Sequence, residues 1–123
     1  MKLSRATVLI LLALMGTAMA TSVDDPFKKF SGTYWIYSGS LGDSGPPTAS
    51  DKKVGFAIKG NAARELFNAL GPDVHDICTE GSGTRVRHKD KEKLSCRRSR
   101  EGEYQCHFGF DLRTGKGIGG IIC

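Results

Sequence analysis

The stretch KKVGFAIKGNAARELFNALGP, residues 52–72, decides the fold, because it runs from an alternating segment straight into a helical one. In residues 52–59 the apolar side chains of Val54, Phe56 and Ile58 recur at every second position. This is the period of a β-strand that buries one face. The sequence therefore predicts a strand here and places these three side chains on its core side.

Residues 60–70 have the spacing of an amphipathic helix. The apolar positions of this segment are Ala62, Ala63, Leu66, Phe67 and Leu70. Gly71 and Pro72 follow directly, and a proline cannot continue the helix. We expect a single helix that lies against a sheet through this apolar stripe.

The last forty residues predict an antiparallel meander of three strands, at residues 84–96, 104–112 and 116–123. Arg100, Glu101 and Gly102 fit a three-residue hairpin loop that has glycine in the left-handed position. This loop sets Ser99 opposite Glu103 and, further along the strands, residue 96 opposite residue 106.

A four-residue loop at residues 113–116 fits the second connection of the meander. It sets Leu112 opposite Gly117 and residue 106 opposite residue 123. Phe108, Phe110 and Leu112 then share the core face of the middle strand with Cys106. We expect the helix to pack on this face.

Residues 32–38 (GTYWIYS) predict one more strand, because they are rich in aromatic and β-branched side chains. The pattern does not decide whether Tyr34 and Ile36 or Trp35 and Tyr37 point inward. The Gly-, Pro- and Ser-rich residues 38–51 predict a loop. Together these predicted elements indicate an α+β fold, in which one short helix packs on an antiparallel sheet of about five strands. We expect a signal peptide at residues 1–20, a loosely ordered segment at 21–31 and one domain at 32–123.

The first twenty residues are typical of a cleavable export signal. Lys2 and Arg5 precede an apolar run too short to span a bilayer, and Ala18 and Ala20 suit a signal peptidase. No transmembrane segment is predicted in the remaining chain. The sequence therefore predicts an exported protein, periplasmic or extracellular.

Four cysteines follow the predicted signal peptide: Cys78, Cys96, Cys106 and Cys123. An even number in an exported chain of this size indicates two disulfides. We favour the pairs Cys78–Cys96 and Cys106–Cys123 among the three possible connectivities. A zinc site is the alternative, but the spacing lacks a C-x-x-C pair, so no metal and no cofactor is expected.

Positive charge is concentrated in residues 85–100 (RVRHKDKEKLSCRRSR), which hold eight basic and two acidic residues, a net charge of +6. Without Lys2 and Arg5 the chain keeps 16 of its 18 basic residues against 13 acidic ones, a net charge of +3. Alternation along a strand would place the odd-numbered basic residues on one face. The predicted binding residues are Arg85, Arg87, Lys89, Lys91, Lys93, Arg97 and Arg98.

Such a face attracts anions, and an acidic protein or another anionic macromolecule is the partner that we expect. Nucleic acid is less favoured, because the segment has no aromatic side chain on which bases could stack. An inhibitor or immunity-type protein is one concrete form of this function. The alternative explanation of the charge is that lysines on an edge strand discourage aggregation.

Two other classes of function stay open. His88, His107 and Asp111 could be assembled into a small secreted hydrolase or nuclease, and His75 lies between two aspartates. No spacing demands such a site, so no catalytic residue is assigned. The third class is a structural or envelope-associated protein. The sequence does not decide the oligomeric state.

Overall fold

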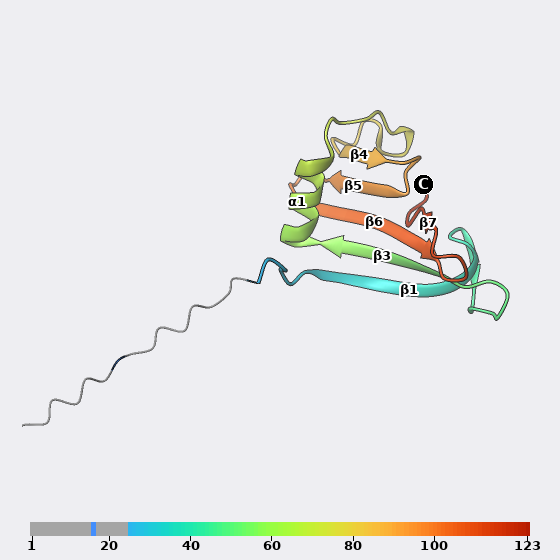
Figure 1. The fold of residues 1–123 in the computed structure, drawn as a ribbon. Helices are drawn as coiled ribbons and strands as arrows, with labels where there is room; N and C mark the ends of the chain where they lie inside the picture. Colours follow the sequence, from blue (N-terminus) through green and yellow to red (C-terminus); the bar gives the residue numbers. More distant parts are fainter. Residues whose placement is uncertain (1–15, 17–24) are drawn as a thin grey trace, which may run out of the picture.

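A computed structural model describes residue 16 and residues 25–123. The predicted signal peptide lies outside these residues, apart from Gly16. One helix packs on a seven-stranded antiparallel sheet with the order β2-β1-β3-β6-β5-β4, and β7 pairs with β6 (Figure 1). The elements are β1 (Ser31–Ser40), β2 (Asp43–Gly45), β3 (Lys53–Lys59), α1 (Gly60–Leu70), the 3-10 turn Ile77–Thr79, β4 (Arg85–Lys89), β5 (Leu94–Arg98), β6 (Tyr104–Asp111) and β7 (Gly117–Ile118).

The α+β prediction is confirmed, and the helix begins and ends where the sequence places it. Ala63 and Phe67 of its apolar stripe are fully buried against the sheet. Below them lie Ile58, Cys96 and Cys106, which the pairing of β3, β6 and β5 sets in one cross-strand row. The main core cluster is therefore the small space between α1 and this row, while Tyr37 and Val86 are buried on the opposite face of the sheet.

The helix covers only one end of the sheet, where it crosses the strands (Figure 1). The expectation that Phe110 and Leu112 belong to the core is therefore wrong: they are 39% and 46% exposed. Val54 and Ile58 are buried as predicted, while Phe56 and Phe108 are half-buried. The helix lies across β3, β6, β5 and β4, and because a helix with its side chains is about 10–12 Å wide it covers only a few residues of each strand.

The predicted strand at residues 84–96 is two strands, β4 and β5, joined by a tight turn. Asp90, Lys91 and Glu92 all have positive φ angles there, of 51°, 53° and 69°. Asp90 is a residue type that turns accept, but the alternation of basic residues from Arg85 to Lys93 favours one continuous strand. Basic residues before and after the turn therefore do not form one continuous stripe.

The hairpin between β5 and β6 has the predicted register. The Ser99 amide donates to the Glu103 carbonyl oxygen at 2.8 Å, and Gly102 has a φ angle of 87°. Cys96 consequently lies directly opposite Cys106. These two cysteines form a disulfide, and Cys78 forms the other with Cys123. Two disulfides are confirmed, but the favoured connectivity is wrong.

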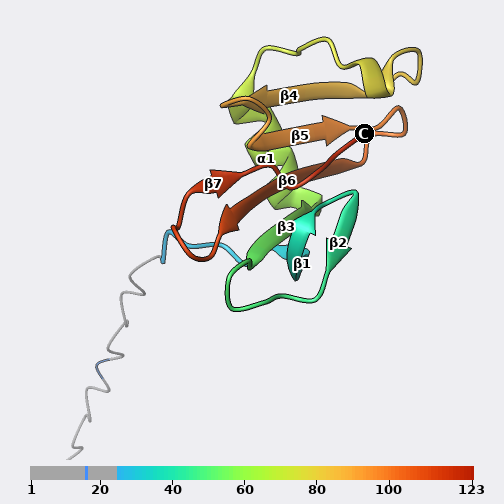
Figure 2. The ribbon, with the colours of Figure 1, turned by 90° about the vertical axis from the view of Figure 1, so that its right-hand side faces the viewer.

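The pairing of β7 with β6 is shifted by two residues from the predicted register. Gly117 pairs with Phe110, rather than with Leu112, because the loop closes between Asp111 and Lys116. Beyond Ile118 the chain cannot continue along β6, since β5 already occupies that edge from Phe108 onward. The tail leaves the sheet there, as Figure 2 shows for the chain after β7.

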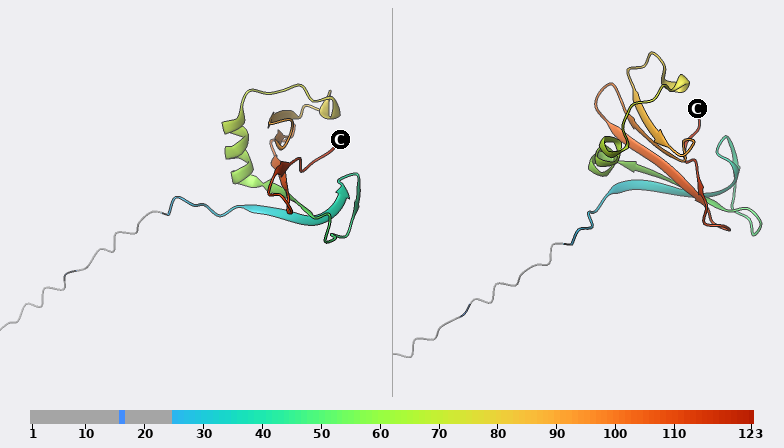
Figure 3. Two further views of the ribbon diagram at one scale, coloured as in Figure 1. Left: turned by 45° about the vertical axis from the view of Figure 1, so that its right-hand side comes forward. Right: turned by 45° about the horizontal axis from the view of Figure 1, so that its top comes forward.

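Glycine is needed where the tail leaves the sheet. A Cβ atom on Gly120 would lie 2.6 Å from the Phe108 carbonyl oxygen, so only glycine permits this crossing. The tail then runs over the face opposite α1, where Cys123 reaches Cys78. In the left view of Figure 3 the helix and the tail lie on opposite sides of the strands. The helix and the tail with its disulfide thus lie on opposite faces of the sheet.

The first strand is longer than predicted, and the segment after it is not only a loop. Residues 38–40 continue β1 and pair with β2, which the sequence assigns to the loop at residues 38–51. Of the two pairs that the sequence left open, only Tyr37 is buried, at 2% exposed, and it lies on the face opposite α1, whereas Trp35 is 48% exposed. No helix among the described residues has the length and apolar character needed to cross a bilayer.

Candidate binding surface

An uncovered cross-strand row lies directly beside the row under the helix. Strand pairing aligns one residue from each of five strands along it, on the face that carries α1. We call four of them the aromatic row: Leu94, Phe108, Phe56 and Tyr34. Lys89 of β4 continues the row beyond Leu94.

The side chains of the aromatic row contact one another across the strands. The rings of Phe56 and Phe108 stack with their centroids 5.1 Å apart. Phe110 stands edge-on to Phe108 at 6.1 Å, and Tyr34 lies 6.5 Å from Phe56. Aromatic pairs in these geometries stabilise a fold by more than the burial of their surface alone. The row is therefore a preformed apolar floor.

An open groove of about 590 Å³ lies over this floor on the β5 side. Its apolar side chains come from the helix, from β3, β5 and β6: Leu66, Ile58, Leu94, Phe108 and Phe110. Charged side chains enter it only from the β4–β5 turn and the end of β4, namely Lys89, Asp90 and Lys93. The groove thus has an apolar floor and a mainly basic side.

Lys89 and Lys93 form what we call the lysine rim of the groove. Lys93 lies 3.5 Å from Asp90, and its side chain stays 45% exposed. Lys89 makes no ion pair within the described part of the chain, and Lys91 is exposed in the same turn. The rim therefore keeps positive charge that is not neutralised at close range.

Two of the predicted binding residues, Arg85 and Arg87, are instead held by Asp73. The Arg85 Nε donates to Asp73 Oδ2 at 2.7 Å, and the Arg87 Nε donates to Asp73 Oδ1 at 2.8 Å. Arg87 also donates to the Phe67 carbonyl oxygen and lies 4.3 Å from the Phe67 ring centroid. With a third hydrogen bond, from Arg85 Nη2 to Asp73 Oδ1 at 3.1 Å, the two arginines lower the pKa of Asp73 to about 2. These arginines brace the end of the helix.

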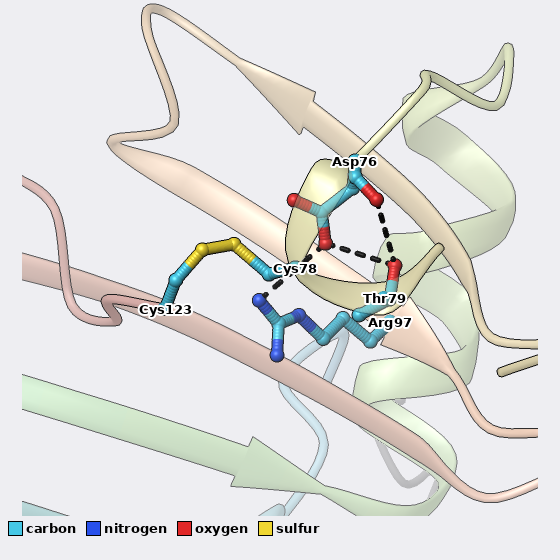
Figure 4. Close-up of a disulfide and its surroundings, with 5 residues drawn as sticks. All are labelled: Asp76, Cys78, Thr79, Arg97 and Cys123. Carbon is cyan, nitrogen blue, oxygen red and sulfur yellow. Dashed lines mark hydrogen bonds and ion pairs between the residues drawn. A yellow bond between two sulfur atoms is a disulfide. The ribbon is translucent and has the colours of Figure 1, made fainter. Parts of the chain in front are cut away.

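Arg97 and Arg98 are divided between the two faces of the sheet. The Arg97 guanidinium lies 3.7 Å from the Asp76 carboxylate, beside the disulfide of Cys78 and Cys123 (Figure 4). Its Nε is buried without a hydrogen-bond partner among the described residues. Arg98 lies over the Tyr104 ring, 5.9 Å from the centroid, on the helix face. Of the predicted face, Lys89 and Lys91 make no ion pair among the described residues, while Lys93 lies 3.5 Å from Asp90.

His88 and His107 do not meet in the structure. His88 and His107 lie on the face opposite α1, in one cross-strand row, with Ser95 of β5 between them. Two strand spacings separate them by roughly 9–10 Å. Burial lowers the pKa of His107, and Arg97 and Lys59 lower it further. His75 lies 3.3 Å from Glu80 and lines one pocket together with His88. This arrangement gives no hydrogen-bonded catalytic pair among the described histidines.

The described residues contain no group of three or more His, Cys, Asp or Glu side chains that could hold a metal ion. No family model matches the chain, and comparisons with curated proteins and with solved structures found no match either. The function must therefore be argued from the surface itself.

Sequence reasoning missed the groove because it treated Phe108 and Phe110 as core residues. Two signals pointed to it. The predicted strands carry more apolar side chains on their core face than one short helix can cover. Tyr34, which pairs with Phe56, adds an aromatic side chain to the aromatic row. The sequence also singled out Lys89 and Lys93, but their position beside apolar side chains depends on the turn that begins at Asp90.

Proposed function

We propose that this protein is a binding protein whose groove receives an acidic, amphipathic segment of another protein. The observation that carries the proposal is the uncovered aromatic row with the exposed lysine rim at its end. Large exposed apolar patches with a polar rim mark interaction sites on small proteins. Tyr34 is 70% exposed and Phe110 is 39% exposed, so the row continues outward from the core as a surface.

The shape of the groove favours a segment that presents one apolar face. Helix α1 forms one wall through Leu66, and the β4–β5 turn forms another through Lys93. Between them lies a floor of Phe108 and Phe110. A helix or strand of a partner that lays its apolar side chains into this floor uses a common mode of peptide recognition.

Charge selects an acidic partner over a neutral one. Lys89 and Lys93 would meet the polar face of the bound segment, and carboxylates there would pair with them. Pairs of this kind act mainly on orientation and on the association rate, and they weaken as salt rises. An inhibitor or immunity-type protein that engages an exported enzyme is one form that such a binding protein takes. Export itself rests on the predicted signal peptide.

The test uses two synthetic helical peptides as probes. Both have Leu on one face, and the other face carries Glu in one peptide and Lys in the matched control. Fluorescence anisotropy with the oxidised protein is expected to show binding of the Glu peptide and at least about tenfold weaker binding of the Lys peptide. Affinity for the Glu peptide is expected to fall as salt is raised.

Variants locate the binding on the molecule. Phe110→Ser and the double variant Lys89→Glu/Lys93→Glu are expected to weaken Glu-peptide binding. Ile122→Ser replaces an exposed apolar residue of the tail, on the other side of the sheet, and is expected to leave it unchanged. Equal affinity for both peptides would contradict the proposal. So would binding to anionic lipid vesicles without binding to the Glu peptide.

A further inference from the structure

The two disulfides of the chain differ in their exposure to solvent. Cys96 and Cys106 are fully buried under α1. Cys78 and Cys123 are both exposed, and the tail that ends in Cys123 lies on the other side of the sheet (Figure 3). Exposed disulfides are the ones that a thiolate can reach, and they are the labile or regulatory ones among disulfides. The two bonds are therefore expected to respond differently to a reductant.

The tail of the chain, residues 119–123, has few attachments other than this disulfide. Strand β7 ends at Ile118, and no backbone hydrogen bond joins residues 119–123 to the rest of the described chain. Of its two large apolar side chains, Ile121 is only half-buried and Ile122 is 56% exposed. Opening of the disulfide would therefore leave the tail with little to hold it on the sheet.

The segment around Cys78 is attached by other contacts. The Val74 amide donates to the Val86 carbonyl oxygen at 2.8 Å, which ties this segment to β4. The Asp76 carboxylate lies 3.7 Å from the Arg97 guanidinium of β5 (Figure 4). This end of the disulfide therefore stays in place when the bond opens, and the tail is the part that moves.

The tail covers a hollow on this face of the sheet. A pocket of about 330 Å³ lies between the tail and strands β4 and β5. Its lining includes Ile121 of the tail and Val86, His88 and Ser95 of the two strands. Val86 and Ser95 are only 3% and 4% exposed. Release of the tail would therefore bring water to side chains that are now covered.

Two buried nitrogen atoms on this face have no hydrogen-bond partner among the described residues, namely Arg97 Nε and His107 Nδ1. Arg97 lines the pocket beneath the tail, and His107 lines another pocket together with Gly120 of the tail. A buried polar group without a partner costs free energy, which contact with water would recover. The polar groups under the tail therefore favour its release once the disulfide is open.

We infer that the disulfide of Cys78 and Cys123 is a thiol–disulfide exchange site, and that its opening by a dithiol releases the tail from the sheet. One thiolate of the dithiol attacks a sulfur of the bond, and the other cysteine leaves as a thiolate. The second thiolate of the donor then breaks the mixed disulfide. The dithiol is thereby oxidised to a disulfide, two electrons pass to the protein, and the two protons of the dithiol end on Cys78 and Cys123.

The helix side of the sheet would not take part in this change. The disulfide of Cys96 and Cys106 ties β5 to β6 beneath α1, where a dithiol does not reach it. The groove lies on that side as well, so Glu-peptide binding does not depend on the tail. The inference is therefore independent of the proposed function, and either can fail without the other.

Differential alkylation of the cysteines tests the inference. The oxidised protein is incubated with dithiothreitol without denaturant, free thiols are alkylated at intervals, and the labelled peptides are identified by mass spectrometry. Cys78 and Cys123 are expected to be labelled together, at least about tenfold faster than Cys96 and Cys106. In the NMR spectrum of the partly reduced protein, the signals of the residues under the tail are expected to shift, while those of α1 are unchanged.

The double variant Cys78→Ser/Cys123→Ser removes the bond without a reductant and leaves no free thiol. Its signals for Val86 and Ser95 are expected to match those of the partly reduced protein. Ile122→Ser alters the tail but keeps the disulfide, and it is the matched control. Its signals for the same two residues are expected to match those of the oxidised protein.

Equal labelling rates of all four cysteines would overturn the inference, because the exposed bond would then open only when the whole domain unfolds. Faster labelling of Cys96 and Cys106 would overturn it too. So would a reduced Cys78 and Cys123 pair with the signals of Val86 and Ser95 unchanged, because the tail would then stay on the sheet. Should the double variant fail to fold, the labelling and the spectrum of the unaltered protein still decide.

Discussion

Lys89 of β4 and Tyr34 of β1 lie at opposite ends of one cross-strand row, with an unbroken series of apolar side chains between them. The neighbouring row is buried by α1, while this one is open. The surface therefore has a direction, from a positive end at the β4–β5 turn to an aromatic end at the free edge. The proposed function follows from this polarity.

Phe67 is expected to be the residue on which the helix depends most. It is 1% exposed, packs on Tyr104 at 5.4 Å and lies under Arg87. Phe67→Ala is expected to reduce the free energy of unfolding by about 3–5 kcal/mol, because it leaves a cavity in a small core. Urea denaturation of the oxidised protein measures this loss.

Phe110→Ala provides the control for that measurement. Its side chain is already partly in water, so the expected loss is below about 1.5 kcal/mol. A larger loss for Phe110→Ala than for Phe67→Ala would mean that the aromatic row, rather than the space under α1, is the core.

Asp73 is expected to make stability fall in acid. Its pKa is lowered from 3.8 to about 2 by the hydrogen bonds from Arg85 and Arg87. A lowered carboxyl pKa stabilises the folded state above pH 4, and this contribution is lost as pH falls from about 4 to 2. The Asp73 side chain is 41% exposed, so the contribution is only about 0.2–1 kcal/mol.

Asp73→Asn removes that titration and keeps the size of the side chain. The variant is expected to be less stable at neutral pH and to lose less stability than the unaltered protein between pH 4 and pH 2. Parallel pH profiles for the two proteins would show that Asp73 does not hold the arginines in solution.

The disulfide of Cys78 and Cys123 is expected to support the fold without contributing to the groove. It closes a 45-residue segment, for which the loop-entropy model gives about 4 kcal/mol. The double variant Cys78→Ala/Cys123→Ala is expected to lose that much stability and to bind the Glu peptide unchanged, because the tail lies on the other face.

The disulfide of Cys96 and Cys106 supplies the comparison, because both cysteines are fully buried under α1. Cys96→Ala/Cys106→Ala is expected to lower stability and also to weaken peptide binding, since α1 forms a wall of the groove. Equal effects of the two double variants on peptide binding would contradict the assignment of the groove to the helix side.

Local patterns predicted the elements with strong signals of their own. The helix at residues 60–70 has an apolar stripe and a proline stop, and the loop at Gly102 fixes the register of Cys96 against Cys106. The β4–β5 turn was missed because its positive φ angles belong to Asp90, Lys91 and Glu92, which lie within an alternation of basic residues that favours one strand. Without this turn, the basic residues from Arg85 to Lys93 were expected on one face of a single strand.

The remaining differences depend on contacts between distant segments. The disulfide of Cys123 follows from the tail leaving β6 where β5 already pairs, which no local spacing encodes. The role of Asp73 as the acceptor for Arg85 and Arg87 depends on where the helix ends in space. Sequence patterns identified the lysines and the apolar strands, but not that the two meet in one groove.

Chemical-shift mapping with the Glu peptide tests the central claim most directly. An NMR titration of the labelled, oxidised protein is expected to shift the signals of Lys89, Leu94, Phe108 and Phe110 together, with one binding constant. The signals of the opposite face, such as those of Ser95 and His107, are expected to shift little. Shifts centred on the opposite face, or no saturable shifts at all, would contradict the account.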